Sequence, residues 1–127
     1  MSQYVDGNYK TFVADAAVAI YQRVKLDADG RVTVAGLADR DIGTAVKPAF
    51  AAGDEITVKL RTASGTHKMI VSEAVAAGAL LYTESDGEVQ DTAQATGFAI
   101  GTALEAATAD QDVIEVLYSQ HGDTAAS

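Results

Sequence analysis

The chain has 127 residues, a net charge of −9 at pH 7 and no cysteine, so disulfides, thiol chemistry and cysteine-ligated metals are excluded. All nine Lys and Arg lie between Lys10 and Lys68, whereas residues 73–127 carry ten Asp or Glu and no basic residue; such an acidic surface disfavours binding to nucleic acid. No apolar run approaches the roughly 20 residues of a membrane span, and the N-terminus with Asp6 is unlike a signal peptide, so we expect a protein made in the cytoplasm with no membrane partner.

The apolar content supports one modest core. Hydrophobic residues make up 48% of the chain, but 25 of them are alanines, and there is no tryptophan. Since alanine buries little area, burial of further apolar surface against identical neighbours would add stability. We therefore expect an oligomer.

Residues 1–15 have no clean periodicity, yet they contain Tyr4, Tyr9 and Phe12. A disordered tail is usually poorer in aromatic residues. Two interpretations stay open: an irregular lead-in whose rings fold back onto the domain, or an extended arm that orders on a neighbouring subunit or a partner. In the second case the three aromatic side chains are the expected contact residues.

Residues 16–36 predict a short turn, Ala16 to Ile20, followed by a β-hairpin. Valine and leucine alternate with polar residues on both sides of the turn Asp27–Gly30. The turn resembles the start of a calcium loop, but it lacks the further oxygen ligands and the bidentate glutamate of such a loop. We interpret it as a turn and expect no metal.

Residues 37–61 contain the segment Ile42–Val46, a short helical turn expected between Pro48 and Gly53, and a strand over Ile56–Leu60 with one solvated face. Glycine within a strand usually marks a bulge or a close approach of another backbone. Gly43 is therefore a predicted packing point.

Residues 62–66 are the expected connection to a second β unit. That unit begins with a strand at His67 and continues through a turn at Glu73–Gly78, a hairpin around Ser85–Gly87 and a helical turn at Leu104–Ala107. The last strand, Val113–Tyr118, is apolar on both faces except at Glu115, which predicts a central strand or one covered by a neighbour. Residues 119–127 are small and polar and are expected to form a flexible tail.

The two units are an internal repeat. Ile42–Val46 returns almost unchanged at Ile100–Leu104, which pairs Gly101 with Gly43, and Asp54 falls on Asp112 at the same spacing of 58 residues. The sequence therefore predicts a mainly β fold: one small barrel- or sandwich-like domain over residues 16–118, built from related units at about 16–61 and 67–118, with short helical turns and an extended N-terminal arm (1–15).

No catalytic constellation is recognisable. The two histidines, His67 and His121, have no serine or carboxylate partner at a known spacing, and no phosphate loop, nucleophile elbow or metalloprotease motif is present. We expect no enzyme activity and no cofactor.

The order and spacing of these segments resemble the capsid decoration (cement) proteins of tailed bacteriophages. The resemblance extends over about residues 14–118, and its clearest pieces are Ala16–Ala19, Val24–Val32, Ile42–Ala45, Ala51–Val58, Ala74–Gly78, Asp86–Val89 and Ile100–Leu104.

This resemblance implies a structural protein without catalytic residues, located on the outer surface of the capsid in the virion. It implies binding to the major capsid protein as a homotrimer at three-fold and quasi-three-fold positions, where the shell is stabilised. A surface-adhesion or receptor-binding module of a virion is the alternative. Such a module is expected to carry aromatic residues at its loop tips, where this sequence has Asp and Gly.

Overall fold

A computed structural model of the protein describes residues 7–118, which form ten strands and one short 3-10 helix. The first five strands are β1 (Tyr9–Val13), β2 (Arg23–Leu26), β3 (Val32–Val34), β4 (Gly43–Ala45) and β5 (Glu55–Leu60). The others are β6 (His67–Ile70), β7 (Leu80–Thr83), β8 (Val89–Gln90), β9 (Ala99–Ala103) and β10 (Val113–Tyr118), with the 3-10 helix η1 (Ser85–Gly87) between β7 and β8. Within the described residues, no helix has the length and apolar character needed to cross a bilayer.

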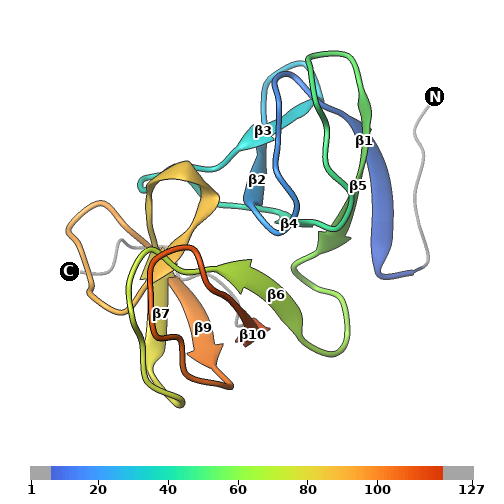
Figure 1. Ribbon diagram of the computed structural model, residues 1–127. Helices are drawn as coiled ribbons and strands as arrows, with labels where there is room; N and C mark the ends of the chain where they lie inside the picture. The colour runs from blue at the N-terminus through green and yellow to red at the C-terminus, as the bar shows by residue number, and fades with distance from the viewer. Residues whose placement is uncertain (1–6, 119–127) are drawn as a thin grey trace.

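The ten strands form two sheets with the same strand order. The first sheet runs β1-β5-β4-β2-β3 and the second β6-β10-β9-β7-β8, and all neighbours are antiparallel. Each strand of the second sheet stands where its counterpart stands in the first. The predicted duplication of a β unit is therefore confirmed, and Figure 1 shows the two units as separate lobes. We call β1–β5 lobe 1 and β6–β10 lobe 2.

Each sheet curls until its two edge strands meet, β1 with β3 and β6 with β8. Ala14, directly after β1, forms a parallel bridge with Val32 of β3, and Val71, directly after β6, forms one with Val89 of β8. The N–H groups of Asp15 and Ser72 donate to the carbonyl oxygens of Val32 and Val89 at 2.8 and 3.0 Å. Each lobe is thus a small, partly closed barrel, and the predicted mainly β class is confirmed.

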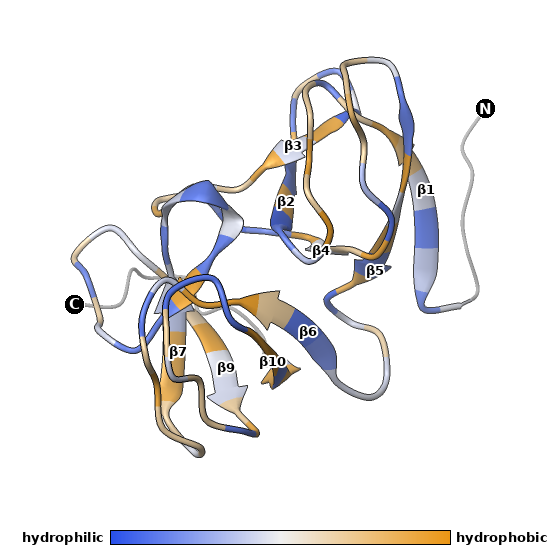
Figure 2. Ribbon diagram, in the orientation of Figure 1, coloured by the Kyte–Doolittle hydropathy of each residue, from blue (hydrophilic) through white to orange (hydrophobic). Residues whose placement is uncertain are grey.

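Each lobe buries an apolar core of its own. Alternate residues of the strands are buried, as Ile56 and Val58 are on β5, and Figure 2 shows hydrophobic and hydrophilic residues alternating along β2. The core of lobe 1 consists of Ala14, Val18, Val24, Val32, Ala45, Ala49, Ile56 and Val58. The core of lobe 2 consists of Met69, Val71, Val75, Leu81, Val89, Ile100, Ala103, Ala107, Ile114 and Val116. The last strand, β10, lies between β6 and β9, which confirms its predicted central position.

The two short helical turns predicted at Pro48–Gly53 and Leu104–Ala107 are wrong. Neither segment is helical, because Ala49 and Ala107 form β-bridges across the lobe and Ala51–Gly53 form a turn. Val18 and Ala49 exchange two hydrogen bonds of 2.9 Å, and Val75 and Ala107 do the same at 3.1 and 2.9 Å. The only helical element in residues 7–118 is η1.

An aspartate follows each of these segments, and its carboxylate holds the preceding backbone by accepting two N–H groups. Asp54 Oδ2 accepts the N–H groups of Phe50 and Ala51 at 3.0 and 3.1 Å. Asp112, its counterpart, accepts those of Thr108 and Ala109 at 2.9 and 3.2 Å. The bonds from Thr108 and then Ala109 hold the pKa of Asp112 below its usual range.

The expected arm over residues 1–15 needs a correction from residue 9 onward. Residues 9–13 are β1, which pairs with β5 of the same chain in the register Tyr9↔Lys59 to Val13↔Glu55. Phe12 packs against the core of lobe 1. Without β1, the backbone of β5 would be an unpaired edge; the first repeat therefore begins at β1, the counterpart of β6. Tyr4 lies outside the described residues.

The predicted packing glycines occupy equivalent positions on β4 and β9, and both are buried. A methyl group at Gly43 would lie 2.1 Å from the carbonyl oxygen of Lys59 on β5, a distance that no side chain tolerates. Gly101 lies opposite Leu81 and Tyr118 on the neighbouring strands.

Candidate functional site

A buried arginine joins the two lobes. Arg23, the first residue of β2, is 0% exposed. Its Nε and Nη2 atoms donate to the carbonyl oxygens of Glu88 and Glu84 in lobe 2 at 3.0 and 2.7 Å, and Nη1 forms an ion pair of 3.0 Å with Asp41. Burial lowers the pKa of Arg23, and Asp41 opposes that shift. A buried charge needs this full set of partners, because an unpaired one is strongly destabilising.

The turn of lobe 2 that receives Arg23 requires a glycine. Gly87 has a φ of 69°, and a methyl group there would lie 2.9 Å from Cβ of Gln22 and 3.0 Å from the carbonyl oxygen of Arg23. Its N–H donates to the carbonyl of Ala35 at 2.8 Å, and the Gln22 amide donates to the carbonyl of Asp86 at 2.8 Å. The turn therefore lies directly on the start of β2.

His67, one of the two candidate catalytic histidines, is a packing residue. It is 2% exposed, and its Nε2 lies 3.0 Å from the carbonyl oxygen of Leu60, so Nε2 is the donor. Its ring meets that of Tyr118 edge-on at 4.7 Å, and the Tyr118 hydroxyl donates to Asp41. Nδ1 is buried without a hydrogen-bond partner. Burial lowers the pKa of His67, which favours the neutral ring. The other histidine, His121, lies outside the described residues.

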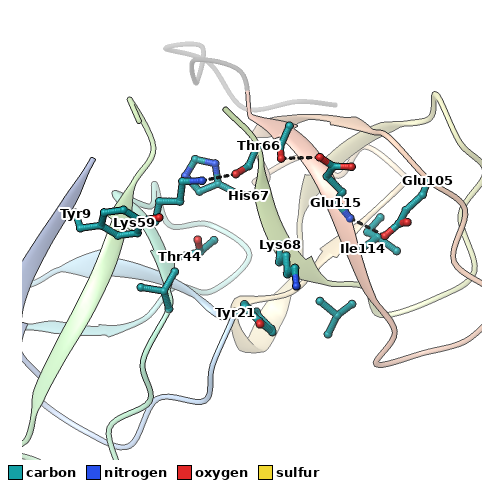
Figure 3. A pocket seen from close by; sticks show the side chains of 12 residues that line it. Tyr9, Tyr21, Thr44, Lys59, Thr66, His67, Lys68, Glu105, Ile114 and Glu115 are labelled. Carbon is teal, nitrogen blue, oxygen red and sulfur yellow. Dashed lines mark hydrogen bonds between the residues drawn. The ribbon is translucent and has the colours of Figure 1, made fainter. Parts of the chain in front are cut away.

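An open groove of about 740 Å³ separates the lobes (Figure 3). Tyr9, Tyr21 and Lys59 line it from lobe 1, and Lys68, Glu105 and Glu115 line it from lobe 2. Its polar groups are already engaged with one another: the Lys59 ammonium donates to the carbonyl of Thr66, the Thr66 hydroxyl donates to Glu115 at 2.7 Å, and the Lys68 ammonium lies 5.7 Å from the Tyr21 ring centre. The contacts of Lys59 and Lys68 link the two lobes across the groove.

Of the aromatic residues predicted to make contacts, Tyr9 and Phe12 lie in the described part of the chain, and they differ in exposure. Tyr9 is 51% exposed and stands at the rim of the groove. Phe12, on the same strand, is half-buried against the core of lobe 1, with the Lys10 ammonium 5.6 Å from its ring centre. Tyr9 is thus the accessible member of the described pair.

The acidic hairpin turn of lobe 1 brings Asp15, Asp27 and Asp29 together, with carboxylate oxygens within 4.8 Å of one another. The Arg31 N–H donates to Asp27 and Asp29 at 3.2 and 3.3 Å, and the Arg31 guanidinium lies 3.9 Å from Asp15. Oxygen ligands of this type suit Ca²⁺, but three carboxylates fall short of the six to eight ligands it takes. Asp27 and Asp29 hold the turn through the Arg31 N–H, while Asp27 Oδ2 is buried without a hydrogen-bond partner, and the expectation that this turn holds no metal stays a prediction.

Sequence reasoning missed several exposed apolar side chains. Phe50 is 83% exposed beside Ile20 in lobe 1. In lobe 2, exposure reaches 61% at Leu80, 51% at Leu117, and 43% at both Leu104 and Val113. The only sequence signal was the apolar pattern on both faces of Val113–Tyr118.

Comparison with known proteins finds similarity among solved structures. No protein-family model matches the chain, and no curated protein matches it. Among the solved structures that match, one has a TM-score of 0.71 and 21% sequence identity, over 87% of this chain and 92% of that one. The chain is similar in fold to the head fiber gp8.5 N base in bacteriophage phi29. At this identity the likeness establishes the fold, and it spans both lobes because it covers most of each chain.

Proposed function

We propose that this chain is a structural protein of a phage virion that decorates the outer surface of the assembled head. The observation that carries the proposal is the two-lobed β fold, which is similar over 87% of the chain to the head fiber base of a phage head. The resemblance of the sequence to phage capsid decoration proteins supports the same role from independent evidence.

The chemistry of the molecule supports a role in binding. The buried polar groups between the lobes, Arg23, Asp41 and His67, are used to hold the lobes together. Several large apolar side chains, among them Phe50, Leu80 and Leu117, are exposed, and such side chains suit a contact with another protein.

In the proposed role, three copies form a trimer at a three-fold or quasi-three-fold position and contact several major capsid subunits at once. The assembled shell is then stabilised by mass action, since the decorator binds the assembled form better than the free subunits. Of the two described aromatic residues predicted from the sequence to make contacts, Tyr9 is the better placed, because half of its surface is exposed at the groove.

Co-sedimentation with phage heads tests this proposal. The full chain is mixed with heads that lack it and with heads that already carry it, and the pelleted protein is quantified per head. We expect saturable binding at a fixed stoichiometry to the undecorated heads only, together with a higher temperature of head disruption. If the chain stays in the supernatant with undecorated heads, the decoration role is excluded.

A further inference from the structure

The outward faces of the two sheets carry different side chains at equivalent places. In lobe 1, one row across the strands is Arg23, Thr44 and Lys59, and the same row in lobe 2 is Leu80, Thr102 and Leu117. Arg23 and Thr44 are 0% and 1% exposed, because lobe 2 covers them. Leu80 and Leu117 are 61% and 51% exposed. One repeat therefore has its outer face covered by the other repeat, and the second has the same face bare.

The bare face is apolar over several strands. Leu80, Leu104, Val113 and Leu117 form it, and we call these four residues the lobe 2 face. On β10, exposed Val113, Glu115 and Leu117 alternate with buried Ile114 and Val116. Leu104 lies beside Glu115, since its N–H donates to the Glu115 carbonyl at 2.9 Å. A group of large aliphatic side chains at 43–61% exposure is unusual for a surface that stays in water.

Lobe 1 carries a second apolar surface at a different place. Ile20, Pro48 and Phe50 border a shallow depression of about 490 Å³ whose floor includes Val18 and Ala49, and we call these three residues the Phe50 patch. The equivalent residues of lobe 2 are Ala77, Ala106 and Thr108. The patch therefore exists only in lobe 1, as the bare face exists only in lobe 2.

We propose that the lobe 2 face of one copy binds the Phe50 patch of a second copy, so that copies associate head to tail. Within one chain, lobe 2 covers the outer face of lobe 1; in the proposed contact, a second copy covers the equivalent face of lobe 2. The side chains differ accordingly: Arg23 and backbone carbonyls make the internal contact, and aliphatic and aromatic side chains make the contact between copies.

Charge selects this pairing over the pairing of like surfaces. Glu105 and Glu115 are exposed beside the lobe 2 face with one cation, Lys68 of β6, opposite Glu115, so two such faces placed together would bring an excess of carboxylates against each other. The Phe50 patch is bordered by the exposed Lys47, while nearby Asp54 is occupied by the N–H groups of Phe50 and Ala51. The pairing therefore gives an apolar contact in which the carboxylates beside the lobe 2 face meet Lys47 beside the Phe50 patch.

A contact between two different surfaces generates a closed ring when the rotation between copies permits closure. The pairing names the surfaces that build the trimer of the proposed function. It rests on the proposed function only for the number of copies in the trimer.

Sedimentation velocity of the full chain tests the pairing. Phe50→Asp disables the patch and Leu117→Asp disables the face, and we expect each variant alone to be monomeric where the wild type is oligomeric. An equimolar mixture of the two variants should form a heterodimer, because one intact face and one intact patch remain between them. Leu26→Asp is the matched control: Leu26 is 50% exposed on β2, outside both surfaces, and this variant should keep the wild-type oligomer.

Three results would overturn the pairing. They are a monomeric wild type, a variant mixture that stays monomeric, and a single variant that still forms the wild-type oligomer, which would mean that like surfaces pair. Circular dichroism checks that each variant is folded, and Leu80→Thr replaces Leu117→Asp if that substitution unfolds lobe 2. Head binding is measured separately: heads that bind a monomeric wild type retain the decoration role and reject the pairing, whereas an oligomer that fails to bind heads does the reverse.

Discussion

Lobes 1 and 2 share a strand order, a closing parallel bridge and an aspartate that holds the preceding backbone, but they differ where they face other surfaces. Arg23 of lobe 1 stands where lobe 2 has Leu80, and Lys59 stands where lobe 2 has Leu117. The inward residues are apolar in both lobes. The comparison teaches that the pattern of inward residues sets the fold of each repeat, whereas a few outward positions decide whether a face is covered from within the chain or left bare.

The largest expected effect is at the glycine common to both repeats. Gly43→Val places a side chain against the Lys59 carbonyl, which cannot move without breaking the β4–β5 pairing, and we expect a loss of about 3 kcal/mol in the free energy of unfolding. Gly101→Val on β9 should cost about 1–3 kcal/mol. Urea unfolding measures the stability of both variants. A wild-type unfolding midpoint for Gly43→Val would show that the Lys59 carbonyl does not lie this close to Gly43.

Exchange of the residues that distinguish the two faces should have unequal effects. Arg23→Leu, which installs the residue of lobe 2 in lobe 1, leaves the carbonyls of Glu84 and Glu88 without their arginine donor and Asp41 without its ion pair. We expect a loss of about 3 kcal/mol and separate unfolding of the lobes. Leu80→Arg, the reverse change at an exposed site, should alter stability by less than about 0.5 kcal/mol. Equal losses of stability in the two variants would contradict the conclusion that the site of Arg23 is covered by lobe 2 and the site of Leu80 is exposed.

Mild acid should weaken the junction between the lobes. Burial lowers the pKa of His67 below its ordinary value of 6.5, so the unfolded chain binds this proton more readily than the folded one. The stability that depends on the neutral ring is therefore present above pH 6.5 and is lost as the pH falls below it.

Thermal melts at pH 7.5 and 5.5 measure this effect. We expect the unfolding temperature to fall between these two pH values and the fall to be smaller in His67→Gln, whose amide can still donate to Leu60. His121→Gln is the control and should behave like the wild type. A pH-independent melting temperature in the wild type would remove the role assigned to His67.

The smallest effect is expected at the aspartates that hold the preceding backbone. Asp54→Ala and Asp112→Ala each remove an acceptor for two backbone N–H groups, so each should lower the melting temperature slightly, and by similar amounts because the geometry is the same in both lobes. Differential scanning calorimetry at pH 7 compares the two. A large effect at only one site would show that the two segments are not equivalent.

Much of the fold follows from local patterns in the sequence. The hairpin turn at Asp27–Gly30, the return of Ile42–Val46 at Ile100–Leu104 and the apolar strand Val113–Tyr118 predicted the repeat, both hairpins and the central position of β10. These features depend on alternation and turn chemistry, which act between residues close in the chain.

The remaining features depend on contacts between distant residues. Pro48–Gly53 has the composition of a helical turn, but its backbone bonds to Val18, some thirty residues earlier in the chain. Residues 9–13 were placed in an arm because their partner, β5, lies far along the sequence. Arg23 is one of the polar residues that alternate with Val24 and Leu26 in the hairpin, and nothing near it in the chain indicates the turn of lobe 2 that buries it.

Arg23 recognises lobe 2 through main-chain oxygens and not through side chains. The contact with Arg23 therefore depends on the shape of the turn and on Gly87, and not on the identity of the exposed residues at its tip, Ser85 and Asp86. Amino-acid replacements at that tip can alter the exposed surface of lobe 2 without removing the acceptors that bury Arg23.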